Sequence, residues 1–137
     1  MVEIVLASHG DYCLGLKQTA EMITGPAENL SALSFRPGED PEQYQHDLQE
    51  MIESRMQKGE VLLLIDLKGG TPYNMAMLTK QKLDFKVIAG ANVPMLLSLL
   101  TSSPANASEA VEIALNQENW GIELEEMPQV KHRRILK

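Results

Sequence analysis

The sequence has a single cysteine, Cys13, which excludes an intramolecular disulfide and fits a reducing compartment. Cys13 falls within a helical pattern, so we expect a small core residue there rather than a thiol nucleophile. No apolar run approaches the roughly 20 residues of a membrane-spanning helix. The N-terminus also lacks the basic region and cleavage site of a signal peptide, since Met1 leads directly into a predicted strand. We therefore expect a cytoplasmic protein.

Positive charge is scarce as well. Twelve lysine and arginine residues stand against 19 acidic ones, which gives a formal net charge of -7. This balance argues against a nucleic-acid partner, because phosphates favour basic surfaces. It suits a partner with a positive face, although solubility alone explains the charge equally well. Histidines, cysteines and acids are not spaced as metal ligands, and we expect neither a metal nor a cofactor.

The chain shows no internal repeat, no low-complexity tract and no interdomain linker. Its 137 residues, 44% of them hydrophobic, are enough for one domain with a core of its own. We place this domain at residues 1–125. The remainder, 126–137, is predicted to be a basic C-terminal tail around Lys131-His132-Arg133-Arg134.

What the chain does contain is a regular alternation of strands and helices. Apolar runs predict a strand that ends at His9, followed by strands at 32–35, 61–65 and 85–89, and a short final strand at Ile122-Glu123-Leu124. Helical patterns begin near residues 13, 41, 71, 94 and 106, several of them at capping residues or prolines. Residues predicted to face inward from the first and last helices are Cys13, Leu16, Ala20, Ile23, Val111, Ala114 and Leu115.

This alternation predicts an α/β fold, a doubly wound parallel sheet with helices on both faces. The strand at 61–65 is a continuous apolar run, as expected of a central strand covered on both sides. The flavodoxin-like order 2-1-3-4 places the first and third strands side by side at the switch point, where ligands bind. Those strands end at His9 and Asp66, so the two side chains are predicted to meet.

A histidine that accepts a phosphoryl group must present one unprotonated ring nitrogen to the phosphorus. Asp66 is the natural partner for the other nitrogen, because a carboxylate fixes the tautomer and stabilises the charge that develops on the ring. That arrangement leaves Nε2 of His9 as the nucleophile, although either nitrogen fits the sequence. Two plainer interpretations remain: His9 as a satisfied core histidine, and Asp66 as a residue that only caps its loop.

Donors for phosphoryl oxygens are predicted just after Asp66. Gly69 and Gly70 allow close approach of backbone N–H groups, and the helix that begins at Thr71 adds its free N–H groups and its hydroxyl. The Asn92 side chain, after the fourth strand, opens towards the same edge of the sheet. A double glycine on its own is often only a turn, and its position between an acid and a helix start favours the phosphate site.

With these residues assembled, the chain resembles the enzyme IIA components of the mannose family of the bacterial phosphoenolpyruvate-dependent sugar phosphotransferase system. The resemblance runs from residue 2 to around residue 120. Three segments carry it: Ser8-His9-Gly10, Asp66-Leu67-Lys68-Gly69-Gly70-Thr71-Pro72-Tyr73-Asn74, and Ile88-Ala89-Gly90-Ala91-Asn92-Val93-Pro94-Met95. Lys68 stands where some members have an aromatic residue.

The resemblance implies that His9 is the phosphorylated histidine, Asp66 its partner and Thr71 the hydroxyl near the phosphate. It implies a phosphotransferase that takes phosphate from HPr and hands it to a IIB protein, which serves membrane IIC and IID components. It also implies a homodimer that exchanges a final strand, here Ile122-Glu123-Leu124 or the segment just after it.

Three other functions are weighed against this one. Histidine phosphatases also place a histidine and a glycine after a first strand, but they need an arginine where Ser8 stands, and none of the arginines at 36, 55, 133 and 134 falls in a predicted site loop. A receiver-like domain has the same sheet order but phosphorylates an aspartate, and would have acids in place of Ser8 and His9. A non-catalytic regulatory module that senses the phosphorylation state of its partners fits the sequence as well as a carrier does.

Overall fold

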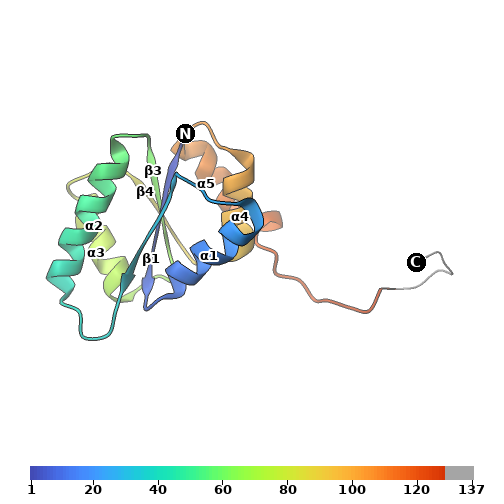
Figure 1. The fold of residues 1–137 in the computed structure, drawn as a ribbon, viewed down its shortest axis with the longest axis horizontal. Coiled ribbons are helices and arrows are strands. Elements are labelled where there is room, and N and C mark those ends of the chain that lie inside the picture. Colours follow the sequence, from blue (N-terminus) through green and yellow to red (C-terminus); the bar gives the residue numbers. More distant parts are fainter. Residues whose placement is uncertain (129–137) are drawn as a thin grey trace.

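The computed structural model describes residues 1–128, which form one sheet with helices on both sides (Figure 1). The strands are β1 (Glu3–His9), β2 (Leu30–Phe35), β3 (Val61–Ile65) and β4 (Lys86–Ala89). The helices are α1 (Tyr12–Thr24), α2 (Pro41–Met56), α3 (Gly70–Lys80), α4 (Val93–Ser102) and α5 (Ala107–Leu115), followed by the 3-10 helix η1 (Gln117–Asn119).

The sheet is parallel throughout, in the order β2-β1-β3-β4. The predicted flavodoxin-like order is therefore confirmed, with β1 and β3 as the central pair. Their register joins Ala7 to Ile65, and the backbone N–H of Asp66 donates to the Ala7 carbonyl at 3.2 Å. His9 and Asp66 consequently leave the sheet at the same edge, next to each other.

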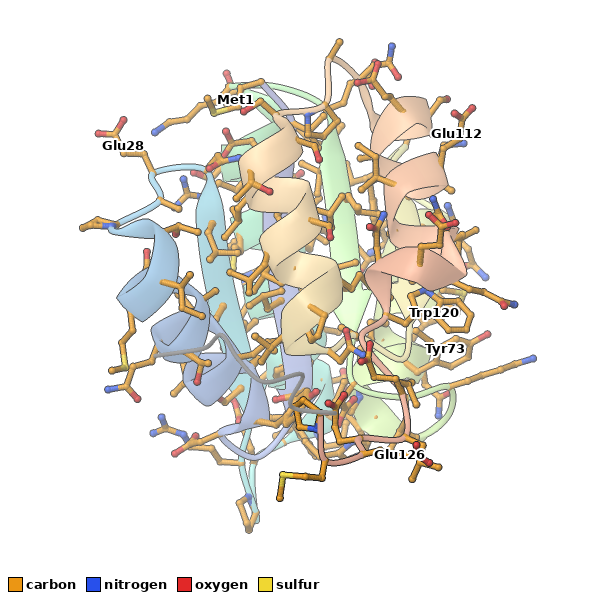
Figure 2. All side chains as sticks on the ribbon, turned by 90° about the vertical axis from the view of Figure 1, so that its right-hand side faces the viewer. Met1, Glu28, Tyr73, Glu112, Trp120 and Glu126 are labelled. Atoms are coloured by element: carbon orange, nitrogen blue, oxygen red, sulfur yellow. The ribbon has the colours of Figure 1, made fainter. Side chains whose placement is uncertain are left out.

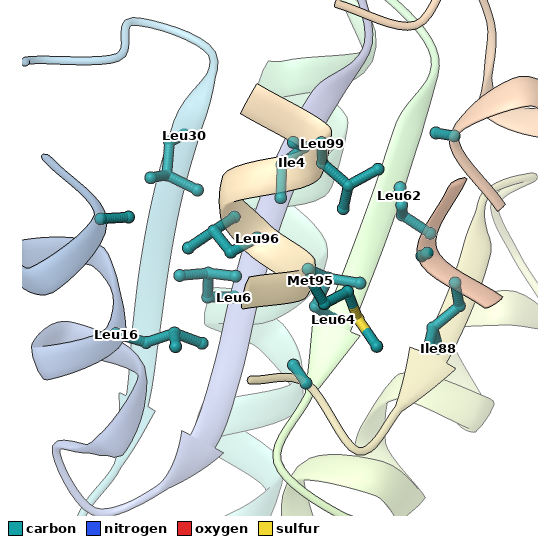
Figure 3. Packing of buried hydrophobic residues seen from close by; sticks show 14 of the residues in the cluster. Ile4, Leu6, Leu16, Leu30, Leu62, Leu64, Ile88, Met95, Leu96 and Leu99 are labelled. Carbon is teal, nitrogen blue, oxygen red and sulfur yellow. The ribbon is translucent and has the colours of Figure 1, made fainter. Parts of the chain in front are cut away.

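Two apolar layers enclose the sheet. Helices α1, α4 and α5 lie side by side over one face, as Figures 1 and 2 show, and α2 and α3 cover the other. On the first face Leu96 of α4 packs near Leu6 of β1 (Figure 3). All five residues of β3 are buried, as the apolar run at 61–65 predicted. The strands that carry His9 and Asp66 are thus packed against apolar side chains on both faces of the sheet.

Local sequence explains where most helices begin and end. Asp40 and Asn106 accept hydrogen bonds from the backbone N–H groups three residues ahead of them, as expected of N-cap residues. Helix α1 ends at Thr24, and Gly25 follows with φ +84°. Helix α3 begins at Gly70, one residue earlier than predicted, and no side chain caps it.

Two residues predicted to face inward are exposed. Ile23 lies ten positions after Cys13, where an α-helix has turned about 80° away from the buried stripe. Leu115 is adjacent to the buried Ala114 and points about 100° away from it. The predictions for Ile23 and Leu115 were therefore wrong, whereas those for Cys13 and Ala114 are confirmed.

The predicted final strand at Ile122–Leu124 is also wrong for this single chain. Residues 121–128 leave the fold as an exposed segment without regular structure, because no strand lies beside them to supply a hydrogen-bonding partner (Figure 1). The basic residues 131–134 of the predicted tail lie outside the described residues. Within residues 1–128, no helix is both long enough and apolar enough to cross a membrane.

Candidate functional site

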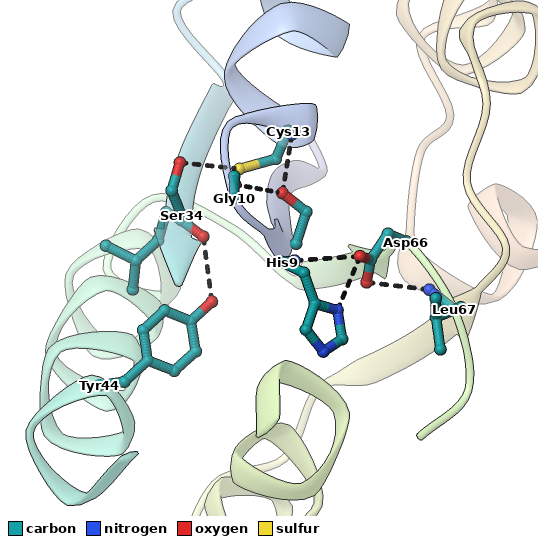
Figure 4. Close-up of polar contacts among 9 residues, drawn as sticks. His9, Gly10, Cys13, Ser34, Tyr44, Asp66 and Leu67 are labelled. Carbon is teal, nitrogen blue, oxygen red and sulfur yellow. Dashed lines mark hydrogen bonds and ion pairs between the residues drawn. The ribbon is translucent and has the colours of Figure 1, made fainter. Parts of the chain in front are cut away.

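His9 and Asp66 meet at the carboxyl end of the sheet, as predicted (Figure 4). The Nδ1 atom of His9 lies 3.0 Å from Oδ2 of Asp66, and the two side chains are 44% and 13% exposed. A carboxylate oxygen accepts hydrogen bonds and cannot donate them, so Nδ1 carries the proton. In the neutral ring, this tautomer leaves a lone pair on Nε2.

Backbone donors hold the Asp66 carboxylate in place. Its Oδ2 accepts the backbone N–H of His9 at 3.0 Å, and its Oδ1 accepts that of Leu67 at 2.9 Å. Both oxygens are thus engaged, and one of them binds the backbone and the ring of the same histidine. The carboxylate aims the imidazole and does more than cap its own loop.

The Nε2 side of the ring faces the start of α3. A β-carbon built at Gly70 would clash with Nε2 and Cε1 of His9, and Gly70 also has φ +79°. Both observations require glycine at this position. The preceding Gly69 has φ +113° and open space where a β-carbon would lie. Gly70 therefore brings the backbone close to the imidazole, and Gly69 supplies the unusual backbone angle that precedes it.

The first turn of α3 offers hydrogen-bond donors beside Nε2. The first N–H groups of an α-helix have no partner within the helix, and in α3 no side chain caps them. Such a terminus carries a partial positive charge that favours anions. Thr71, half-buried in this turn, adds a hydroxyl. Nε2 of His9 thus lies beside the uncapped start of α3, where an anion is favoured.

The turn after His9 depends on Ser8, to which the sequence alone assigned no role of its own. Its buried hydroxyl donates to the Gly10 carbonyl at 2.9 Å and accepts the Cys13 N–H at 2.8 Å. Gly10 itself has φ +59°, and its N–H donates to the Phe35 carbonyl at 2.7 Å. Ser8 thereby fixes the turn that presents His9. A small hydroxyl residue shortly before a helix start was the available signal.

Asn92 is not brought to His9 by any hydrogen bond within residues 1–128. Its side-chain oxygen accepts the Met95 N–H at 3.0 Å and caps α4, while its nitrogen donates to the Trp120 carbonyl at 2.8 Å. Figure 2 shows Trp120 beside the end of α5. Asn92 thus joins α4 to the segment that follows α5.

The two arginines within residues 1–128 form ion pairs with acidic residues other than Asp66. Arg36 pairs with Asp11 at 3.3 Å, and Arg55 pairs with Glu3 at 3.5 Å near the opposite end of β1. Neither arginine of residues 1–128 is hydrogen-bonded to His9, in contrast to what the anion-binding arginine beside a phosphatase histidine would suggest. Among residues 1–128, no group of three or more histidines, cysteines and acids is arranged to hold a metal ion.

These features define a flavodoxin-like α/β protein with an aspartate-held histidine at the switch point of its sheet. Comparison with protein families takes this further, since the family described as "PTS system fructose IIA component" (EIIA-man) matches residues 3–115. The chain therefore belongs to the EIIA-man family of phosphotransferase-system IIA components.

Curated relatives agree with this assignment. The chain is 36% identical over 104 residues to the fructose-specific EIIA component of Bacillus subtilis, an alignment that covers 74% of this chain and 70% of that protein. It is 33% identical over 124 residues to the mannose-specific EIIAB component of Escherichia coli K12, covering 88% of this chain and 38% of that protein. The chain thus spans well under half of the latter.

Solved structures agree as well. A PTS IIA protein associated with the fucose utilization operon of Streptococcus pneumoniae has a TM-score of 0.74 and 34% identity, covering 84% of this chain and 89% of that one. The mannose/sorbose-specific IIA subunit of Enterococcus faecalis has a TM-score of 0.81 at 24% identity, covering 94% and 98% of the two chains, which shows the shared fold.

The predicted membership of the mannose family is thus confirmed. Components of this family are phosphotransferases that pass phosphoryl groups between proteins, with HPr and IIB as the partners that the family implies. The phosphatase and receiver interpretations are set aside by this membership.

Proposed function

We propose that this protein accepts a phosphoryl group from phospho-HPr on Nε2 of His9 and passes it to a IIB protein. The observation that carries the proposal is the Nδ1–Asp66 hydrogen bond, which leaves Nε2 unprotonated on an exposed ring. A nucleophile with a free lone pair, open to a protein-sized donor, is what such a transfer needs.

The proposed transfer needs no external base. The Nε2 lone pair of His9 attacks phosphorus while the nitrogen–phosphorus bond of the donor breaks, and its electron pair returns to the donor imidazole. His9 then carries the phosphoryl group on Nε2 and keeps the proton on Nδ1, where Asp66 stabilises the positive charge of the ring. The same step in reverse delivers the group to IIB.

The phosphoryl oxygens are assigned to the backbone of Gly69 and Gly70 and to Thr71. This assignment is supported by the contact of Gly70 with the Nε2 edge of the ring and by the uncapped start of α3. Asn92 is left out of this set, because its side chain already serves Met95 and Trp120.

The test is intact-mass spectrometry of the protein after incubation with phosphoenolpyruvate, enzyme I and HPr, under conditions that preserve phosphohistidine. The wild type is expected to gain one phosphoryl group, and H9Q to gain none. The matched control is H46Q, which replaces an exposed histidine on α2 that pairs with Glu50, and it should label fully. A chase with IIB should remove the label; retention after the chase would favour the regulatory module over the carrier.

We also propose that two copies of the chain form a dimer through the free edge of β4. A groove beside this strand is lined from three elements, for instance by Met77, Val87 and Leu115, and by Lys80 and Lys86. The exposed Leu115, which contributes nothing to the chain's own core, gains a function in this proposal.

The segment at 122–127 of a second copy matches that groove. Ile122 and Leu124 are exposed and alternate with Glu123 and Glu125, so a strand made from them would present apolar side chains to one side and acids to the other. The acids complement the two lysines of the groove. Sedimentation equilibrium should show a dimer for the wild type and a monomer for I122D/L124D. M22D, which alters an exposed residue of α1, is the control and should stay dimeric.

We further place the protein in the cytoplasm, where IIB links it indirectly to the membrane components IIC and IID. We retain 1–125 as the carrier domain and 126–137 as a separate tail. A chain shortened after residue 125 should accept phosphate at the wild-type rate. Fractionation of cells should find the protein outside the membrane pellet, and a persistent membrane fraction would contradict this placement.

A further inference from the structure

Tyr12 connects two loops of the site that are far apart in the sequence. It is the first residue of α1, three positions after His9. Its hydroxyl donates to the Ala91 carbonyl at 2.7 Å, across 79 positions of the chain. Although the residue is 47% exposed, its hydroxyl thus reaches the loop between β4 and α4.

The loop that Tyr12 reaches is attached to the strand end that carries Asp66. The N–H groups of Gly90 and Ala91 both donate to the carbonyl of Ile65, at 2.9 and 3.1 Å. Ile65 directly precedes Asp66, and Asp66 binds the ring of His9. These hydrogen bonds and the backbone between them form a closed circuit. It runs from His9 to Asp66, through Ile65 and Ala91 to Tyr12, and back along the backbone to His9.

Most links in this circuit are covalent or start from a backbone N–H, and two start from a side chain: the His9–Asp66 bond and the Tyr12–Ala91 bond. The second lies at the start of α1 and reaches the loop between β4 and α4. Asn92, in the same loop, forms its side-chain hydrogen bonds with Trp120 and with Met95 of α4. The hydroxyl of Tyr12 supplies the bond between this loop and α1.

The environment of the phenol agrees with this position. Burial of the hydroxyl raises the pKa of Tyr12, and the negative charge of Asp66 raises it further. The phenol is therefore a neutral donor at physiological pH and lies within the electrostatic reach of the Asp66 carboxylate.

We propose that Tyr12 is a positioning residue for His9. Its hydrogen bond to the Ala91 carbonyl holds the β1–α1 turn against the end of β3, and so keeps the imidazole within hydrogen-bond distance of Asp66. The proposal rests on the proposed phosphoryl transfer at His9. It assigns to this chain a side chain that acts on the reacting histidine through another segment and does not touch the phosphoryl group.

The test compares Y12F with the wild type. Y12F keeps the aromatic ring and removes only the hydroxyl. We expect the rate of phosphorylation at saturating phospho-HPr to fall about three- to tenfold, the factor that one neutral hydrogen bond supplies. The KM for phospho-HPr should stay within about twofold, because uniform binding of the donor is untouched. The ring ¹⁵N shifts of His9 should move from a protonated Nδ1 towards a mixture of tautomers.

The matched control is Y44F. Tyr44 also donates its hydroxyl to a backbone carbonyl, that of Leu33 at 3.0 Å, and this bond joins α2 to β2 rather than the segments that carry His9 and Asp66. Y44F should lower the unfolding temperature and leave the His9 spectrum and the rate as in the wild type. If Y44F and Y12F change the rate and the spectrum equally, Tyr12 contributes only general stability and the proposal is overturned.

Two further outcomes would overturn it. An unchanged rate in Y12F would show that the circuit does not need the hydroxyl, and a change confined to KM would make Tyr12 a contact for the donor. The spectrum separates this proposal from the proposed function. If the wild type takes up no phosphate, the transfer fails, yet the ¹⁵N shifts of His9 in Y12F still decide whether Tyr12 positions the ring.

Discussion

Asp66 binds His9 twice through one oxygen, since Oδ2 accepts both the backbone N–H and the Nδ1–H of that residue, each at 3.0 Å. The backbone contact fixes the oxygen relative to β1, and the ring contact then fixes the imidazole relative to the same oxygen. The carboxylate therefore sets both the tautomer and the direction of the ring, and in the proposed function the chemistry of Nε2 depends on it.

Replacement of Asp66 by asparagine should slow phosphoryl transfer to His9 without unfolding the protein. The amide no longer enforces a proton on Nδ1 and no longer balances the charge of the phosphorylated ring, so we expect a loss of about 10²–10⁴-fold, as for other orienting carboxylates. Rapid-quench measurement with phospho-HPr gives the rate. Transfer at the wild-type rate would reduce Asp66 to a loop residue.

Replacement of Gly70 by alanine should displace the imidazole. The new β-carbon would clash with Nε2, and a shift of the reacting atom by about 1 Å is enough to cost about 10²-fold in rate. Gly38 supplies the control, because its φ of +80° matches the +79° of Gly70 while its surroundings are open. G38A should share the backbone strain and keep the transfer rate, so equal losses in both variants would contradict a specific contact with His9.

The pKa of Tyr12 should respond to the charge of Asp66. A nearby negative charge disfavours the phenolate, so D66N should lower the pKa of Tyr12 relative to the wild type. The value should stay above the ordinary 10, because burial, the larger cause, is unchanged. NMR titration of the tyrosine ring measures the shift. An equal or higher pKa of Tyr12 in D66N would place the phenol outside the field of the carboxylate.

Tyr44 should make the protein lose stability in alkali. Burial, chiefly, raises the pKa of its hydroxyl above the ordinary value of 10. The unfolded chain then releases this proton at a lower pH than the folded one, so the contribution is full below pH 10 and falls as pH rises beyond it. Y44F should unfold more readily at neutral pH and show a shallower decline of unfolding free energy above pH 10. Parallel curves would contradict this origin.

Much of this fold was predictable, because its determinants are local or periodic. The apolar run at 61–65 required a central strand, and the caps at Asp40 and Asn106 marked helix starts by their own side-chain chemistry. Alternation of strands and helices then brought His9 and Asp66 to one edge. Ile23 and Leu115 were predicted wrongly because each lies at the margin of the buried stripe of its helix. Successive residues are rotated by about 100° around the helix axis, so a hydrophobic residue beside the stripe can point to solvent.

The finer parts of the site depend on contacts that no local pattern encodes. The clash that requires glycine at position 70 exists only after the ring of His9 has been placed. The bond from Tyr12 to Ala91 joins segments 79 positions apart. The amide of Asn92 was expected at the site, and its actual bonds were decided by the start of α4 and by the chain around Trp120.

The most direct measurement is the identity of the phosphorylated nitrogen. The protein, labelled with ¹⁵N in its histidines and phosphorylated through HPr, should show nitrogen–phosphorus coupling at Nε2 of His9 and a proton on Nδ1. Coupling at Nδ1, or on a histidine other than His9, would contradict the claim that Asp66 holds one nitrogen so that the other reacts.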